Sequence, residues 1–462
     1  MNALNRTFMK HKDAPAKHQL PTIVIGAGPV GLAAAAHLVT RGQRPIILEA
    51  GAQIGANMRS WGHVRMFSPW KYNIDTAARK LLLDGGWSPP DDEEGFPTGN
   101  ELIDGYLEPL ARVPQIAAGL RVKTRVIAVS RLGVDKMKTT DRARRPFVVR
   151  VKGPGGDERL LANAVIDASG TYHSPNPLGA DGLPAVGERA VSDRIAYGIP
   201  DILGKARDTY ADKHVLVVGS GHSAFNALLD LEALSWKAPD TRITWTIRRE
   251  APELGGGGRD ELAARGALGQ AVQRLLDTGR ITIKTGFSIE SIERDDGKLV
   301  VRGLSDTIEG VDEIIATTGF RPDHEFLREL RLALDSIVES PSVLAPLIDP
   351  NLHSCGTVPP HGAYELAHPE EQGFFIVGMK SYGRAPTFLM LTGYEQVRSV
   401  VALLDGDEAA AREVQLLLPE TGVCKSDTSG GSCCAPSPSK GESASCCAPA
   451  PRTEAPTTGC CA

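Results

Sequence analysis

Residues 22–49 read TIVIGAGPVGLAAAAHLVTRGQRPIILE. They predict a short β-branched strand, a glycine turn, an Ala- and Leu-rich helix, and a second strand that ends in the acid Glu49. Gly26, Gly28 and Gly31 stand at G-x-G-x-x-G spacing. At this spacing the first glycine permits a tight turn, the second lets the backbone approach a diphosphate, and the third allows close helix–strand packing.

The same stretch predicts which ligand this turn would bind. The helix N-terminus would present free N–H groups to phosphate, and Pro29 joins the glycines as a candidate contact. Glu49 follows Gly26 by 23 residues, where a carboxylate can accept hydrogen bonds from both ribose hydroxyls. We therefore expect an adenine dinucleotide with a free ribose. A glycine turn that serves packing alone is the alternative. Residues 23–39 are too short and too rich in Gly and Pro for a good membrane span.

A second copy of the pattern begins at HVLVVGSGHSAFNALLDL, residues 214–231, and continues with TRITWTIRRE, residues 241–250. Gly219, Gly221 and Ala224 form the G-x-G-x-x-A variant, with His222 and Ser223 inside the turn. This second strand ends in arginines, Arg248 and Arg249, where the first ends in an acid. Guanidinium groups suit a 2′-phosphate, so this copy predicts an NADPH site. A solvated strand end is the alternative for the arginines, and a capping or solvated role is the alternative for His222.

Each copy is followed by a strand-rich excursion that returns to a buried strand and a small-residue turn. The turns are DASG, which ends at Gly170, and ATTG, which ends at Gly319. Because the whole arrangement occurs twice, the sequence predicts an α/β protein with two Rossmann-like, three-layer domains.

This duplication resembles the two-dinucleotide-binding-domain flavoproteins, which include flavin-containing monooxygenases and disulfide reductases. The resemblance covers about residues 20–405, and Gly378 lies in a segment similar to the family's closing element, near the flavin. It implies FAD on the first copy and NADPH on the second, with the NADPH domain inserted in the FAD domain. The implied segments are a flexible extension at 1–19, an FAD-binding domain at 20–210 and 325–420, an NADPH-binding domain at 211–324, and a disordered Cys-pair tail at 421–462.

The cysteine pattern favours the monooxygenase branch of this superfamily. Disulfide reductases need two neighbouring sulfurs beside the flavin, and before the tail the chain has only Cys355. Met379 and Lys380 also stand where those reductases often carry an aspartate. Monooxygenases instead let reduced FAD capture molecular oxygen as a hydroperoxide, in a site that excludes water and admits a small-molecule substrate. The segment after Glu49 supplies candidates for the lining of that site, with core packing as the alternative for each aromatic: Arg59, Trp61, His63, Phe67 and Trp70.

The last residues of the chain form a cysteine-rich tail without large apolar side chains. Such a composition cannot bury enough surface to order itself. Adjacent thiols can bind one soft ion, so the tail predicts capture of a thiophilic metal or metalloid by Cys424, Cys433, Cys434, Cys446, Cys447, Cys460 and Cys461. The combination of the flavoprotein pattern and this tail resembles the flavin-binding monooxygenases associated with arsenic resistance; the tail contributes to this resemblance through its composition alone. A reductase that uses the tail as a relay, and a metalloid-sequestering protein, are the alternatives.

Composition narrows the remaining partners. A net charge of −5 argues against nucleic acid, which favours basic surfaces. The N-terminus has no continuous apolar segment, so we expect no secretory signal, a cytoplasmic location and reduced cysteines. The sequence leaves a homo-oligomer open.

Overall fold

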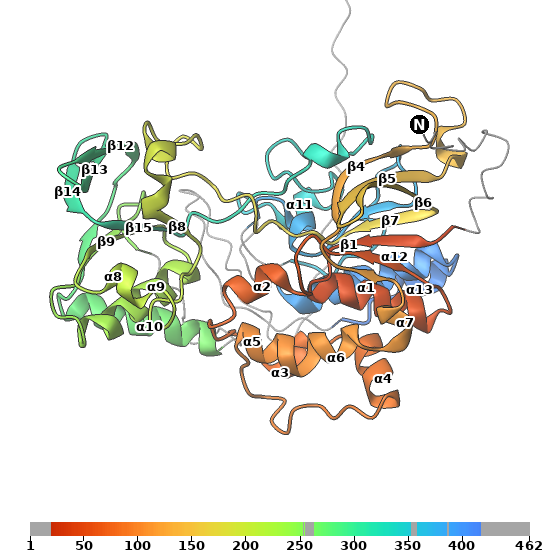
Figure 1. Ribbon diagram of the computed structural model, residues 1–462, viewed down its shortest axis with the longest axis horizontal. Coiled ribbons are helices and arrows are strands. Elements are labelled where there is room, and N and C mark those ends of the chain that lie inside the picture. The colour runs from red at the N-terminus through yellow and green to blue at the C-terminus, as the bar shows by residue number, and fades with distance from the viewer. Residues whose placement is uncertain (1–19, 253, 255–262, 353–357, 386–387, 417–462) are drawn as a thin grey trace, which may run out of the picture. The chain divides into compact units, whose positions relative to one another are not determined.

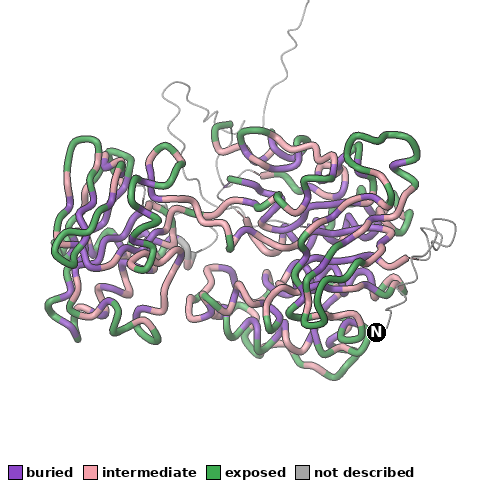
Figure 2. Tube along the Cα trace, turned by 45° about the horizontal axis from the view of Figure 1, so that its top comes forward, coloured by how far each residue is buried: buried purple, intermediate pink, exposed green. Residues whose placement is uncertain are grey.

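The computed structural model describes residues 20–252, 254, 263–352, 358–385 and 388–416. Within these ranges the chain forms two parallel five-stranded sheets, and each sheet has a three-stranded antiparallel sheet beside it (Figure 1). Most residues of the central strands in both parallel sheets are buried, and Figure 2 shows the buried stretches in purple. The predicted α/β class with two Rossmann-like domains is confirmed.

The first parallel sheet has the order β16-β7-β1-β2-β3. Its strands, in that order, are Phe374–Ile376, Ala164–Asp167, Thr22–Ile25, Ile46–Leu48 and Leu120–Arg121. Strand β16 joins this sheet after all strands of the second sheet have been completed along the chain.

Alternation along β1 explains why the sheet has a layer on each face. Val24 pairs in register with Ile47 and Ile166, and all three belong to the apolar cluster that includes the helix residues Leu32 and Val397. The neighbouring residues of β1, Ile23 and Ile25, belong instead to the cluster shared with the antiparallel sheet β4–β6. Because successive side chains of a strand point to opposite faces, three apolar residues in a row, Ile23 to Ile25, produce a strand that is buried on both sides.

The helical layer of this domain is formed by α1, Pro29–Thr40, and α12, Met390–Leu404. The opposite layer consists of β4, β5 and β6, at Arg125–Arg131, Phe147–Gly153 and Gly156–Ala162. Short helices fill the long connection between β2 and β3: α2 Ala56–Ser60, α3 Trp70–Asn73, α4 Thr76–Asp84, α5 Gly99–Leu102, η3 Ile103–Leu107, α6 Glu108–Ala111 and α7 Pro114–Ala117.

The second parallel sheet has the order β11-β10-β9-β15-β8. Its strands, in that order, are Thr282–Lys284, Arg242–Thr246, His214–Val218, Glu313–Ala316 and Ile195–Tyr197. Helices α9, His222–Ser235, and α10, Ala263–Asp277, cover one face. The antiparallel strands β12 Ile289–Asp295, β13 Lys298–Gly303 and β14 Thr307–Val311 cover the other.

The second sheet includes a strand from the connection that leads into it. Strand β8 pairs in parallel with β15, so residues 195–197 belong to this sheet. The connections between the two domains also pair with each other, through a bridge between Pro175 and Phe320. Among the described residues, no helix is both long and apolar enough to cross a membrane.

Candidate functional site

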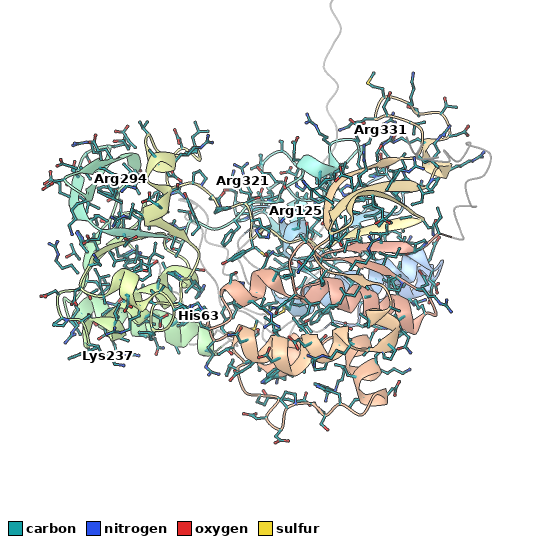
Figure 3. All side chains as sticks on the ribbon, in the orientation of Figure 1. His63, Arg125, Lys237, Arg294, Arg321 and Arg331 are labelled. Carbon is teal, nitrogen blue, oxygen red and sulfur yellow. The ribbon has the colours of Figure 1, made fainter. Side chains whose placement is uncertain are left out.

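A cavity of about 920 Å³ runs along the carboxyl ends of the first sheet's strands. The turns that follow β1, β2, β7 and β16 all contribute to its wall. In open α/β sheets, ligands bind outside the carboxyl ends of parallel strands, so this is the expected place for a ligand. The wall also includes the start of β4, where Arg125 is labelled in Figure 3, and the start of α9 in the second domain.

Two of the predicted glycines are required by close backbone approach at the first turn. A Cβ atom on Gly31 would lie 2.0 Å from the carbonyl oxygen of Gly26, so no side chain fits between strand and helix there. Gly26 itself has a φ of +97°, and a Cβ atom on it would lie 2.7 Å from the carbonyl oxygen of Ala168. The helix therefore packs directly against the turn that follows β1, and this turn packs against the one that follows β7.

Gly28 has a different environment, because a Cβ atom there would meet nothing within 4 Å. Gly28 caps α1 without a side-chain hydrogen bond, Pro29 begins the helix, and both residues line the cavity. The open space next to the N–H groups of the first helical turn fits a diphosphate, which the helix dipole would also favour.

Glu49 lies beside this turn, at the end of β2, and lines the same cavity. Its Oε2 accepts a hydrogen bond from the backbone N–H of Ala27 at 2.9 Å, and its Oε1 accepts one from Gly51 at 2.6 Å. These bonds fix the orientation of the carboxylate. Each oxygen keeps a further acceptor position, as binding of two ribose hydroxyls requires.

The second phosphate turn repeats this construction. Gly219 has a φ of +125°, and a Cβ atom there would lie 2.5 Å from the carbonyl oxygen of Thr317 in the ATTG turn. Trp245 donates from its indole Nε1 to the Gly219 carbonyl at 2.7 Å, which holds the turn against β10. Gly221 meets nothing within 4 Å and caps α9 without a side-chain bond. The turn thus leaves a second helix N-terminus open for phosphate.

The other residues predicted for this second site differ in their positions. His222 and Ser223 line the cavity, whereas Ala224 is fully buried behind them. Arg248 and Arg249 lie exposed just after β10, and Arg248 donates to the carbonyl of Ala180 at 3.1 Å. The carbonyl of Gly319, also predicted for this site, accepts a hydrogen bond from the backbone N–H of Asn176. Gly170 and Gly378, which were predicted for the first site, belong to the cavity wall.

The predicted aromatic segment divides into residues that line the cavity and residues that do not. Trp61 and Phe67 line it, and both come from the connection after α2. The ring of Phe67 lies 5.8 Å from that of His222, so the segment reaches the second phosphate turn. Trp61 and Phe67, together with Met66 and Phe388, contribute apolar side chains to the cavity wall.

Arg59, His63 and Trp70 are not among the lining residues. The guanidinium of Arg59 is paired with Glu108 at 2.5 Å, and Trp70 packs against Gly105. His63, labelled in Figure 3, lies in the turn after α2, and its Nε2 is buried with no hydrogen-bond partner among the described residues. In this structure, therefore, Arg59 and Trp70 contact other protein groups, and all three side chains lie outside the described lining of the cavity.

Two features of the wall were not predicted from the sequence. Tyr172 and Phe320, one from each connection between the domains, stack with ring centroids 5.0 Å apart and both line the cavity. Lys380 is completely buried and pairs with Asp167 at 2.7 Å, directly behind the wall. Both residues appear in motifs that the sequence singles out, but their 213-residue separation hides the pairing.

The proposed metal-binding cysteines, Cys424 to Cys461, lie outside the described residues, as does the N-terminal extension 1–19. Within the described part of the chain, no group of three or more His, Cys, Asp or Glu side chains is arranged to hold a metal ion.

Comparison with known proteins gives a family match over most of the chain. Residues 23–343 match the family described as pyridine nucleotide-disulphide oxidoreductase. Among curated proteins, a ferredoxin–NADP reductase from Salinispora tropica is 27% identical over 328 residues, which cover 69% of this chain and 79% of the relative.

Solved structures extend the likeness of fold. Bacillithiol disulfide reductase from Bacillus cereus matches with a TM-score of 0.61 and 19% identity, over 84% of this chain and 99% of that protein. The cadaverine monooxygenase of desferrioxamine biosynthesis from Erwinia amylovora, bound to FAD, matches with a TM-score of 0.60 and 14% identity, over 88% and 99%. At these identities the likeness is one of fold, and it includes both reductases and monooxygenases.

Proposed function

This chain belongs to the pyridine nucleotide-disulphide oxidoreductase family, and within it we propose that the protein is an NADPH-dependent monooxygenase that acts on a small, soft nucleophile. The coarser part of this description stands by itself. The protein is an oxidoreductase, and its cofactors are FAD and NADP(H).

We assign FAD to the first phosphate turn. Gly28 and the N-terminus of α1 would hold its diphosphate, and Glu49 its adenosine ribose. When bound, FAD supplies a two-electron carrier that NADPH can reduce. NADPH would bind at the second turn, with the N-terminus of α9 toward its diphosphate and Arg248 and Arg249 toward its 2′-phosphate.

The observation that carries the monooxygenase proposal is the chemistry of the cavity wall. Before the tail the sequence contains only Cys355, so the described wall has no pair of neighbouring sulfurs for thiol exchange. Trp61, Phe67 and Phe388 instead give the wall apolar surface, and Phe67 lies next to the second phosphate turn. In the proposed reaction such a wall would limit the access of water to the reduced flavin, so that oxygen is used on the substrate and is not released as peroxide.

The identity of the substrate is a finer part of the proposal. We propose an arsenical, because the seven tail cysteines include three adjacent pairs, and paired thiols suit trivalent arsenic and other soft ions. In this proposal the tail captures the metalloid and the two phosphate turns serve the redox chemistry.

A second candidate is a disulfide or metal(loid) reductase, which the family's description as a disulphide oxidoreductase favours. Electrons would then pass from the flavin to a cysteine pair of the tail, since thiol exchange needs two sulfurs close enough to bond. A protein that sequesters metalloid through the tail, independently of turnover, is the third.

Oxygen consumption by the purified protein separates these candidates. We expect a yellow protein that NADPH bleaches without air, and oxygen uptake that rises when arsenite or methylarsenite is added. Substrate-stimulated NADPH oxidation that continues without oxygen would favour the reductase. A colourless protein that does not oxidise NADPH would contradict both enzymatic candidates.

A further inference from the structure

A fully buried ion pair lies immediately behind the wall of the cavity. The side chains of Lys380 and Asp167 both have 0% exposure, and Lys380 Nζ lies 2.7 Å from Asp167 Oδ2. Lys380 also lies over the ring of Phe326, 4.4 Å from its centroid. Such a pair is costly to desolvate and needs further hydrogen bonds to be tolerated.

These further hydrogen bonds converge on Ser169. Asp167 Oδ1 accepts a bond from the backbone N–H of Ser169 at 3.0 Å, and Lys380 Nζ donates to Ser169 Oγ at 3.2 Å. Ser169 lines the cavity, as does Gly378, which begins the short helix that carries Lys380. The ion pair therefore joins the turns that follow β7 and β16 at the point where both face the cavity.

The direction of these bonds determines what the hydroxyl of Ser169 can do. Because its oxygen accepts from the Lys380 ammonium, its proton has to be donated elsewhere. No hydrogen bond from this hydroxyl to another described residue is present, and Ser169 is half-buried at the cavity surface. A hydroxyl that accepts from a cation is also a stronger donor, because chains of hydrogen bonds polarise one another.

We propose that Lys380 and Asp167 are positioning residues. They hold Ser169 as a hydrogen-bond donor to an oxygen of the ribityl–diphosphate chain of bound FAD. The inference rests on the proposed assignment of FAD to the first phosphate turn.

The test is the affinity for FAD, measured by reconstituting the apoprotein, beside the unfolding temperature. Ser169→Ala should weaken FAD binding by roughly ten- to a hundredfold, the range for a lost bond to a charged or polarised partner, and should lower the unfolding temperature less than Lys380→Met does, because the Lys380–Asp167 contact remains. Ser169→Thr keeps the hydroxyl and should retain most of the affinity.

Variants of the pair separate positioning from simple stabilisation. Lys380→Met leaves a buried carboxylate unpaired and should lower both the unfolding temperature and the affinity. The double variant Asp167→Asn/Lys380→Met should recover much of the stability, but its FAD affinity should remain as low as that of Ser169→Ala. Arg398→Met is the matched control, because it breaks the largely buried pair with Glu395, and neither residue lines the cavity. It should reduce stability and leave FAD affinity unchanged.

Two results would refute the positioning role. One is that Ser169→Ala binds FAD as tightly as the unmodified chain, and the other is that the double variant recovers both its stability and its FAD affinity. If the unmodified chain takes up no FAD at all, the proposed function falls first and the positioning role with it.

Discussion

At the scale of single residues, the three glycines of the first turn differ in what they contribute. Gly31 lies against the Gly26 carbonyl, so its role is in folding, whereas Gly28 faces open space and its role is in binding. We expect Gly28→Ala to fold normally and to lose FAD affinity by tenfold or more, because the added methyl group would occupy the approach of the diphosphate. Gly31→Ala should fail to fold stably, since backbone atoms cannot move far enough. Circular dichroism and flavin content measure both properties, and equal effects of the two changes would contradict this division.

His368 gives a prediction for the pH dependence of stability. Burial lowers the pKa of His368 to about 4, from 6.5 for an exposed histidine. Its Nδ1 accepts a hydrogen bond from the backbone N–H of Ala333 at 3.2 Å, so the neutral ring is the form that fits. Below pH 6.5 the unfolded chain binds a proton that the folded chain does not, so stability falls with pH until about pH 4.

We therefore expect His368 to contribute a loss of about 2 kcal/mol in the free energy of unfolding between pH 7 and pH 5. His214, His324 and His361, whose pKa values are also lowered by burial, add to the loss. Urea denaturation at the two pH values measures it. His368→Gln retains an acceptor without a titrating ring and should show a smaller difference. If His368→Gln shows the same difference between pH 7 and pH 5 as the unmodified chain, other titratable groups cause the loss of stability at acid pH.

At the scale of elements, the two strand–turn–helix units were predictable because every signal in them is local. Strand β1, its glycine turn and α1 are adjacent in the sequence, and so are β9 and α9. Strand β8 could not be found this way, since it has three residues and its only pairing among the described residues is with β15, more than a hundred residues later. The same limit explains why the position of Arg59 was not predicted. Its aromatic neighbours in the sequence suggested that it lines the cavity, but its partner Glu108 lies 49 residues away.

The end of β10 gives a prediction about coenzyme choice. Arg248 and Arg249 are exposed there, where the corresponding strand of the first unit ends in Glu49. We expect replacement of both arginines by alanine to raise the KM for NADPH by roughly ten- to a hundredfold, through loss of charge-assisted bonds to the 2′-phosphate. The KM for NADH, which lacks that phosphate, should change less than threefold. Equal changes for both coenzymes would show that the arginines stabilise the strand end.

At the scale of the whole molecule, both domains contribute to one cavity. Its wall combines strand ends of the first sheet with the start of α9. The ring of Phe67, from the first domain, lies 5.8 Å from the ring of His222, in the second. The sequence predicted the two domains and their cofactors, because each dinucleotide motif is contiguous. It did not predict the Lys380–Asp167 pair or the Tyr172–Phe320 stack, because these contacts join segments that only the completed fold brings together.

The described residues and the cysteine tail can be tested separately, because the cavity wall lies entirely before residue 391. We expect a chain ended after Gly422 to keep its rate of NADPH oxidation within twofold and to lose most of its binding of arsenite, since all seven tail thiols are removed. A full-length chain with those seven cysteines replaced by serine is the matched control, because it retains the length and flexibility of the tail. Stopped-flow absorbance and equilibrium dialysis give the two quantities. If both variants lose turnover, the thiols carry electrons and the reductase is the better description; if only the truncated chain loses it, the tail acts through its backbone.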